Sequence, residues 1–238
     1  MTIWARPEPP RRGGLLSRAE IVRVALEIAD DEGLDAVSIR RLARELGSGA
    51  MSIYHYFASR DELLELMGEN VAAEVLVPEL PEDWRAALTE IAKRSRAAWL
   101  KHPWLLAAVQ ERSTAITPNM LRHVEQSSQA VRPLAELGVE RERLTALVIA
   151  VDDYTLGFTI REVMGRGREM ARRLRDVAEE PHIRYLLESG EFPMLEQFLA
   201  EAKPVTSEAR QNHQVPVSGG FEQGLDWLLD GFAAKLPR

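Results

Sequence analysis

The sequence has 238 residues, a formal net charge of −7 and no cysteine, and 45% of its residues are apolar. A chain of this length forms one or two globular domains. Without cysteine, disulfide frameworks and thiolate zinc sites are excluded, and no apolar run approaches the roughly 18 residues that a membrane span needs. The N-terminal residues lack the apolar segment of a secretory signal, so we expect a cytoplasmic protein with no membrane partner.

Charge is segregated along the first 60 residues. Residues 1–18 carry four arginines against one glutamate, and residues 36–60 carry the same set, so each segment has a net charge of +3. The intervening residues 20–35 carry six acids against one arginine, a net charge of −5. Two basic segments beside an acidic one can make a directed contact with phosphates. An ordinary solvated surface would carry the same charges, so this pattern alone does not establish a phosphate-binding surface.

The first helix is predicted over residues 18–32. Ser17 and Glu20 have the spacing of a capping box, in which the serine oxygen accepts a hydrogen bond from a first-turn amide. Apolar residues then recur at intervals of three and four, which is typical of an amphipathic helix. Gly33 followed by Leu34 supplies a left-handed stop.

Residues 38–57 show two short helical patterns separated by glycine. Ser38 is placed to cap a helix of about two turns, which Gly47 and Gly49 then end. Apolar spacing resumes at once at positions 51, 53 and 57. Two short helices joined by a tight turn and supported by a longer helix are typical of a helix-turn-helix, whose second helix lies in the major groove of DNA. A simple corner between two bundle helices would show the same spacing.

A fourth helix is expected from residue 60, because Ser59 and Glu62 repeat the capping-box spacing. Prolines at 78 and 81 then interrupt the helical pattern, since each lacks an amide hydrogen and disfavours helix in the residue before it. We place the domain junction there. The expected organisation is a flexible basic arm at 1–16, a helix-turn-helix domain at 17–77 and a helical domain at 78–238.

Helical patterns continue beyond the junction. One runs from Trp84 to a stop at His102, where the histidine is expected to cap the last carbonyls. Another begins at Thr117, with a proline in its first turn, and stops near Gly138. Residues 140–163 are apolar on nearly all sides, which predicts a helix buried all round. No strand pattern competes, so the expected fold class is all-α.

The last helix follows a polar stretch with prolines at 203–219, which predicts a mobile linker. The apolar stripe of this helix consists of Phe221, Leu225, Leu228 and Phe232. A monomer would leave the stripe partly exposed, so we expect this helix and the 140–163 helix to pair with those of a second copy in a four-helix bundle. Packing within one chain is the alternative.

Several motifs together resemble the N-terminal domain of TetR-family transcriptional regulators. They are EGL at 32–34, SIRRLARELG at 38–47 and SIYHYFASRDELL at 52–64. More loosely, the segments DWRAAL, KHPWL and AVDDYTLGFTIRE are similar to the C-terminal domain of the tetracycline-repressor branch. The resemblance implies a homodimeric repressor that binds double-stranded operator DNA and leaves it when a small-molecule effector enters the C-terminal domain. An activator, or a regulator without a ligand, would share these features.

The resemblance also implies which side chains meet DNA. It places Arg40 at a base or a phosphate, and it places Ala50, Met51 and Ser52 at the bases. Tyr54 and Arg60 match positions of the family that contact phosphates. Their chemistry agrees, because arginine forks to guanine, methionine and alanine can touch a thymine methyl, and hydroxyl groups suit phosphate. His55 either contacts DNA or packs on the first helix. In the arm, Arg6, Arg11 and Arg12 could follow the backbone or enter a minor groove, although a tail without function would look the same.

An acid pair, Asp152 and Asp153, interrupts the otherwise apolar 140–163 segment, where an unpaired carboxylate would be costly. We therefore expect an effector pocket close to Trp99, Arg112, Asp152, Asp153, Tyr154 and Phe158. Its ligand should be apolar or aromatic with a basic or hydroxyl group. Ion pairs of the aspartates with Arg112 or Arg161 are the alternative. The branch's tetracycline-binding histidine has no counterpart in AVQERST at 108–114, so tetracycline is not the expected effector.

An enzyme is not expected, and neither is a cofactor or a metal ion. Acidic and histidine side chains on the bundle helices could in principle assemble into a metal site; they are His102, Glu111, Asp152, Asp153 and Glu162. Metal-binding helical bundles use Glu-x-x-His motifs from paired helices. The sequence has one such spacing, Glu179 with His182, and no second one to pair with it. A nucleotide-binding loop, a serine nucleophile elbow and the HExxH motif are also missing.

Overall fold

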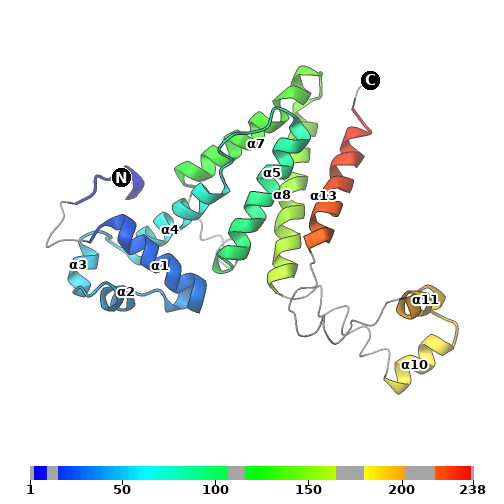
Figure 1. Ribbon diagram of the computed structural model, residues 1–238, viewed down its shortest axis with the longest axis horizontal. Helices are drawn as coiled ribbons and strands as arrows, with labels where there is room; N and C mark the ends of the chain where they lie inside the picture. The colour runs from blue at the N-terminus through cyan, green and yellow to red at the C-terminus, as the bar shows by residue number, and fades with distance from the viewer. Residues whose placement is uncertain (1–2, 10–15, 107–115, 165–179, 202–217, 237–238) are drawn as a thin grey trace. The chain divides into compact units, whose positions relative to one another are not determined.

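The computed structural model describes residues 3–9, 16–106, 116–164, 180–201 and 218–236, and the secondary structure of these residues is entirely helical (Figure 1). The all-α fold class is therefore confirmed. The α-helices are α1 Arg18–Glu32, α2 Ile39–Glu45, α3 Ala50–Tyr54, α4 Arg60–Val75, α5 Trp84–Lys101, α7 Pro118–Glu136, α8 Arg141–Val163, α10 Pro181–Glu188, α11 Pro193–Glu201 and α13 Ser218–Ala233. Short 3-10 turns precede α1 (η1, Ile3–Ala5) and α2 (η2, Leu34–Ala36). The chain divides into two compact units, Met1–Leu156 with Leu228–Arg238, and Gly157–Trp227.

Serine residues start α1, α2 and α4 where the sequence predicts. The hydroxyl oxygens of Ser17, Ser38 and Ser59 each accept a hydrogen bond from the backbone amide three residues later, at 3.1–3.2 Å. These bonds satisfy amides that have no partner inside the helix. In a complete capping box the glutamate also accepts a hydrogen bond from the backbone amide of the capping serine. Here Glu20 instead accepts from Arg23, and Glu62 accepts from the amide of Ala58.

The glycine turn between α2 and α3 is a helix stop followed by an immediate restart. Gly47 has a φ of +58°, a left-handed conformation that favours glycine. Ser48 then donates its amide hydrogen to the carbonyl of Ala43 at 2.8 Å, which closes α2, and Gly49 caps α3. One helix therefore ends and the next begins within a few residues, so α3 can leave α2 at a sharp angle.

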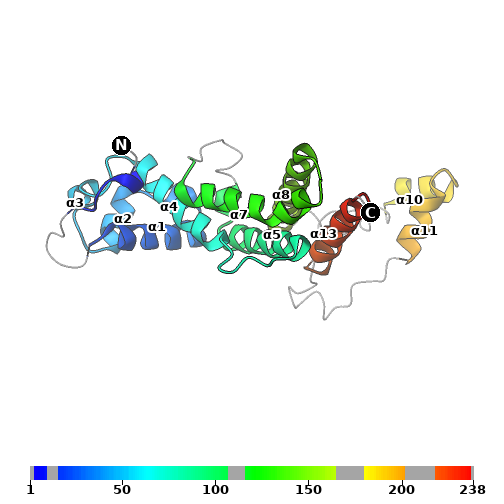
Figure 2. The same cartoon turned by 90° about the horizontal axis from the view of Figure 1, so that it is seen from above.

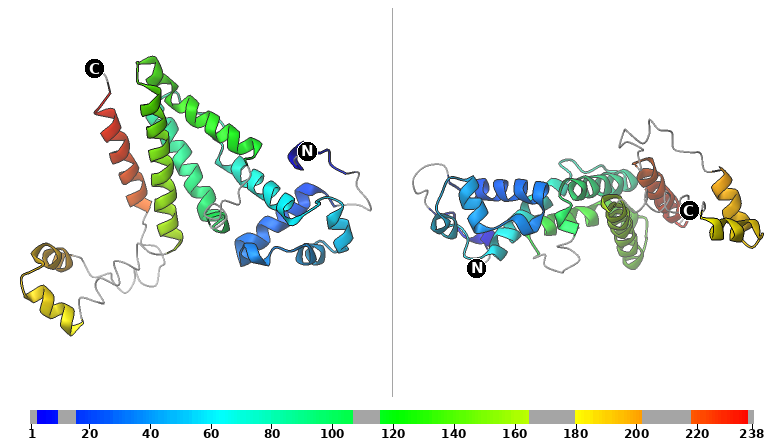
Figure 3. Two further views of the ribbon diagram at one scale, coloured as in Figure 1. Left: turned by 180° about the vertical axis from the view of Figure 1, so that it is seen from behind. Right: turned by 90° about the horizontal axis from the view of Figure 1, so that it is seen from below.

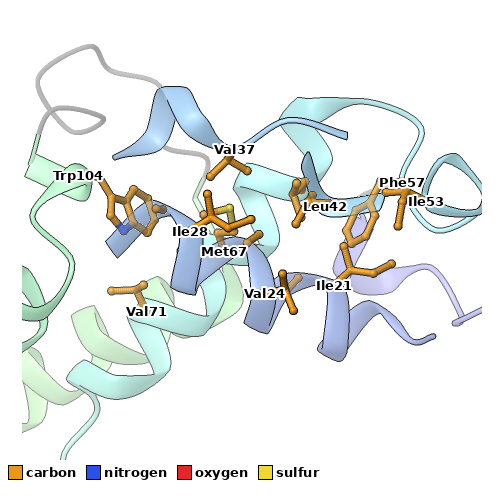
Figure 4. Close-up of a cluster of buried hydrophobic side chains, with 14 of the residues drawn as sticks. Ile21, Val24, Ile28, Val37, Leu42, Ile53, Phe57, Met67, Val71 and Trp104 are labelled. Atoms are coloured by element: carbon orange, nitrogen blue, oxygen red, sulfur yellow. The ribbon is translucent and has the colours of Figure 1, made fainter. Parts of the chain in front are cut away.

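The orientation of α3 depends on the core, because a five-residue helix has little stability of its own. Ile53 and Phe57 are fully buried. Figure 4 shows both of them in one cluster with Leu42 of α2, side chains of α1 and side chains of α4. Burying a side chain of this size stabilises the fold by about 1.5–3 kcal/mol. The hydrophobic cluster therefore holds the short helix in place.

Helices α4, α5 and α7 pack against one another beyond this cluster, and α5 and α7 lie side by side (Figure 2). Gln126 of α7 ties down the connection between α4 and α5. Its side-chain amide donates to the carbonyl of Val77 at 2.6 Å and accepts from the amide of the same residue at 3.0 Å. The proline-containing connection is therefore held to α7 at its first residues.

Helix α8 differs from the predicted helix buried all round. It buries Leu144, Leu147 and Val151, but Ile149 is 53% exposed and both aspartates lie on exposed positions. Apolar residues on nearly all sides show that a helix avoids water. They do not show whether its own chain or a second copy covers each face.

The last helix also differs from the prediction. Phe221 and Leu225 of its expected dimer stripe are only 1% exposed in a single chain, so packing within one chain accounts for them. Near its C-terminal end, Asp230 forms an ion pair with Arg85 and Phe232 meets the ring of Trp84 at 5.9 Å. The exposed apolar residue of α13 is instead Trp227, at 66%.

Two further helices were not anticipated from the sequence. Within the second unit, α10 and α11 pack as a helical hairpin joined at Gly190, which has a φ of +76° (Figure 3). Most of the predicted linker at 203–219 lies outside the described residues, and its last two positions already belong to α13.

The N-terminal segment departs from the expected flexible arm, because residues 3–9 are packed on the helix-turn-helix. Ile3 is buried and η1 lies against α4. Arg6 forms an ion pair with Glu62, and Arg18 donates a side-chain hydrogen bond to the carbonyl of Arg6 at 2.6 Å. One apolar anchor and these polar contacts hold a segment whose prolines and arginines suggested disorder. Arg11 and Arg12 lie outside the described residues.

Acid should loosen this packing through Glu62. The hydrogen bond from Arg6 holds the pKa of Glu62 below its usual value of 4.5, against the opposing effect of burial. A folded-state pKa below the unfolded value contributes stability that is complete above the unfolded pKa and is lost as pH falls through the folded one. Urea unfolding at pH 7 and below pH 4 should therefore show a smaller acid loss in Glu62→Gln than in wild type. Glu79→Gln, at an exposed carboxylate, should keep the wild-type loss, and equal losses in all three proteins would contradict this.

Candidate DNA-binding surface and effector site

Helix α3 presents a polar, accessible face on the side away from its buried anchors. Met51 is 80% and Tyr54 is 49% exposed, and Ser52 and His55 are exposed as well. These side chains project from a helix short enough to enter a DNA groove by its end. Ala50 is half-buried and packs on the hydrophobic cluster, so it offers less surface than the sequence suggested.

An open hollow of about 450 Å3 lies beside α3. It is lined by Leu16, Met51, Ser52, Tyr54, His55 and Tyr56. The Tyr56 hydroxyl donates to the carbonyl of Leu16 at 2.9 Å, which fixes the chain entering α1 against the recognition helix. No local pattern indicates that Leu16 and Tyr56 border this surface, because their contact joins residues 40 apart.

The arginines of α2 divide into held and unpaired groups. Arg41 is held by Glu32 at 2.7 Å and by Glu45 at 3.0 Å. Arg40 is exposed, and among the described residues it has no hydrogen bond or ion pair. Arg44 follows one turn later with only a loose 3.9 Å approach to Glu45. Spacing of four residues puts Arg40 and Arg44 on one helix face, a signal that could have added Arg44 to the predicted contacts.

Arg60 has an intramolecular role in the free protein. Its guanidinium donates to the carbonyls of Val37 at 3.4 Å and Leu34 at 3.2 Å. It therefore ties the turn before α2 to the start of α4. Its predicted phosphate contact would have to share or replace these bonds.

The predicted effector residues are only partly brought together. Trp99 on α5 and Tyr154 on α8 are half-buried, whereas Asp152 and Asp153 lie on exposed positions. Phe158 belongs to the second unit, where its ring meets that of Phe221 at 5.4 Å. Arg112 lies outside the described residues.

The two aspartates form no ion pairs with the residues that the structure describes. Within the described part of the chain neither makes a hydrogen bond or a salt bridge, and Arg161, one suggested partner, lies over the ring of Phe158 at 5.9 Å. Although Asp152 as a residue is exposed, burial of its carboxyl raises its pKa, an effect that His123 opposes and Asp153 reinforces. The alternative pairing with Arg161 is therefore not observed, and the alternative partner Arg112 lies outside the described residues.

His123 of α7 is the residue here that the sequence did not indicate. Its Nδ1 atom is buried and has no hydrogen-bond partner among the described residues. Burial lowers the pKa of the imidazole, while the nearby Asp152 opposes that shift. A buried ring nitrogen without a partner normally has a reason in function or in a bound group. A lone histidine on a helix gives no such signal in a sequence.

Neither a metal site nor a membrane-spanning helix is found in the described ranges. No three histidine, aspartate or glutamate side chains gather there as a metal site. None of the helices found there is long and apolar enough to cross a membrane.

Comparison with known proteins adds two family matches. The family described as "Bacterial regulatory proteins, tetR family" matches residues 21–67, and "Tetracyclin repressor-like, C-terminal domain" matches residues 77–236. The repressor DrrR1 of Streptomyces coeruleorubidus is 32% identical over 237 residues, covering 96% of this chain and 82% of that one. A transcriptional regulator of Saccharopolyspora erythraea is 31% identical over 234 residues, covering 98% and 91%. ActR of Streptomyces coelicolor, solved in complex with actinorhodin, has a TM-score of 0.70 at 29% identity and covers 95% and 99%.

Proposed function

This chain belongs to the TetR family of bacterial regulatory proteins, and from that premise we propose that it is a homodimeric repressor released from operator DNA by a small-molecule effector. In this proposal a helix-turn-helix domain at 17–77 binds DNA, and a domain at 78–238 binds the effector and the second copy. No enzymatic activity is proposed.

The observation that carries the DNA-binding part is the two-sided character of α3. Ile53 is fully buried while its neighbours Ser52 and Tyr54 are exposed, and the unpaired Arg40 stands on the preceding helix. An exposed, anchored helix end with hydroxyl groups and a free guanidinium suits both phosphates and base edges.

The homodimer is supported by apolar surface that a single chain leaves in water. Ile149 of α8 and Trp227 of α13 are each more than half exposed. Large apolar side chains on two helices are a common feature of subunit contacts, and tryptophan is enriched at their energetic centres.

Repression is favoured over activation by the relatives. DrrR1, which matches nearly the whole chain, is named a transcriptional repressor. An activator of the same fold is the second candidate, and a reporter placed behind the selected operator separates the two by the sign of the response.

The effector part rests on polar groups without partners in an otherwise apolar bundle. His123 offers a buried ring nitrogen and Asp152 a carboxyl whose charge is disfavoured. Sites of this type bind mainly apolar or aromatic molecules that carry few polar anchors, and we propose a ligand with a basic or hydroxyl group. ActR, with actinorhodin bound, shows that a related structure holds a small molecule.

The test begins with selection of genomic fragments by the purified protein. The selected sites should share a near-palindrome with half-sites about one turn, ~34 Å, apart or somewhat more, because a two-fold protein matches a two-fold site. Binding to all fragments with equal affinity would overturn sequence-specific regulation.

The same operator then reports effector release. Compounds that release wild-type protein from the operator should be needed at higher concentration to release Asp152→Asn. Asp153→Asn is the matched control, because its side chain points about 100° away around the helix. If both variants fold, bind the operator and respond like wild type, neither carboxylate belongs to the effector site.

A further inference from the structure

The C-terminal end of α5 carries a buried histidine with an unexpected set of partners. His102 is only 1% exposed. Its Nδ1 lies 2.7 Å from Oδ1 of Asp30 on α1, and its Nε2 lies 3.4 Å from Oε2 of Glu74 on α4. The sequence suggested that the imidazole caps the last carbonyls of the helix. Both of its ring nitrogens instead face carboxylates. It joins two carboxylates that belong to two helices of the helix-turn-helix domain.

Two neighbours of His102 bind the same carboxylates. Trp104 donates its ring N–H to Oδ1 of Asp30 at 2.8 Å, and Lys101 reaches both oxygens of Glu74 at 2.7 and 2.9 Å. The Trp104 ring is itself buried in the hydrophobic cluster of the helix-turn-helix domain (Figure 4). We call the four residues Asp30, Glu74, His102 and Trp104 the α5 node; Lys101 adds an ion pair at its exposed edge.

Part of the node borders a groove between α4 and α5. This groove of about 390 Å3 borders Glu74 and Lys101, and its remaining lining includes Glu90, Lys93 and Arg94. Burial disfavours the charged form of Glu74, but Lys101 and His102 more than compensate, so the pKa of Glu74 lies below its usual value. Directional polar contacts, in addition to packing, therefore hold the helices together at this point.

Buried polar contacts of this kind have few intermediate states. A buried donor or acceptor that loses its partner costs more than the net worth of the bond. The end of α5 must therefore either carry α1 and α4 with it or break the node. Two apolar helix surfaces could slide past each other gradually. Here the hydrogen bonds of the node are either formed or broken.

We propose that His102 is a positioning residue that couples the C-terminal bundle to the placement of the DNA-binding helices. It does so by holding Asp30 of α1 and Glu74 of α4 to one end of α5. The inference rests on the proposed function, because it names the contact through which an effector in the bundle controls operator binding.

The test compares His102→Phe with a matched control, Lys101→Gln, in the full-length protein. Phenylalanine keeps the ring but removes both bonds to the carboxylates. Lys101→Gln removes an ion pair to the same Glu74. The Lys101 side chain is 59% exposed, and ion pairs at exposed positions contribute little. The two readouts are calorimetric unfolding without DNA and affinity for the selected operator.

Wild type and Lys101→Gln should unfold in one transition and bind operator alike. His102→Phe should unfold in two separate transitions and lose at least about five-fold in operator affinity, the lower end of usual coupling between sites. A merely structural role would lower the melting temperature of a single transition. A single transition, or unchanged affinity, in His102→Phe overturns the proposal.

Two further measurements keep the test decisive. If His102→Phe does not fold, His102→Gln, which can still donate to Asp30 but not reach both carboxylates, must show the same split and the same loss. Failure of wild type to bind any selected DNA would overturn the proposed function, while the calorimetric comparison would still decide whether the node couples the two domains.

Discussion

Arg40→Ala should cost about 1–3 kcal/mol of operator binding and relax the preference for one base pair in each half-site. The guanidinium is exposed on α2 and has no partner among the described residues, so no intramolecular bond competes with DNA. Arg41→Ala is the matched control, because Arg41 is already held by two glutamates of its own chain. It removes the same charge one residue away and should leave specificity unchanged.

Tyr54→Phe belongs to the same experiment and should behave differently. Loss of a hydroxyl that contacts phosphate weakens binding to all sequences alike, without changing the order of preference. Affinities are to be measured by fluorescence anisotropy on the operator and on single-base variants at one salt concentration. If Arg40→Ala and Tyr54→Phe both bind the operator as wild type does, α3 and its flank are not the recognition surface.

Trp227→Glu should convert the homodimer into a folded monomer that no longer binds operator. Trp227 is 66% exposed in one chain, so a charge there leaves the fold intact but cannot be buried against a second copy. Tryptophan at the centre of an interface commonly contributes about 2 kcal/mol or more to association. Sedimentation velocity and operator binding measure the two effects, and a Trp227→Glu dimer would refute this interface.

Two comparisons distinguish dissociation from unfolding. Trp227→Phe keeps an apolar aromatic side chain and should remain dimeric. Leu225→Glu places a charge at a position that is 1% exposed within one chain, so it should unfold the protein and give no folded monomer. Circular dichroism separates these outcomes before any binding is measured.

Local signals predicted most of the fold. The caps at Ser17, Ser38 and Ser59, the stop at Gly47 and the proline break after Val77 all act within four residues, so a single sequence contains the information that they need. Partners far apart in the chain could not be predicted. Arg6 and Glu62 are 56 residues apart, and Asp30 and His102 are 72 apart, and no local pattern says which carboxylate a given cation will meet.

The surfaces of α8 and α13 show a second limit. Hydrophobic periodicity identified both helices, but it could not show that Phe221 and Leu225 of the expected dimer stripe are covered within one chain. Leu225 and Trp227 are both apolar residues of one helix, and only the packed structure shows that the first is covered by its own chain. The effector residues were limited in the same way, since His123 gains its interest from a burial that the sequence does not contain.

In and beside α3, one set of residues is buried and another faces outward, and this has a consequence for how such regulators diversify. Ile53 and Phe57 hold the helix from inside, while Met51, Ser52 and Tyr54 point outward and contribute little to the core. Substitutions at exposed positions usually change stability by less than about 0.5 kcal/mol. After gene duplication, one copy can therefore acquire a new operator through a few outward-facing changes without first losing its fold, and the two copies cease to compete for one promoter.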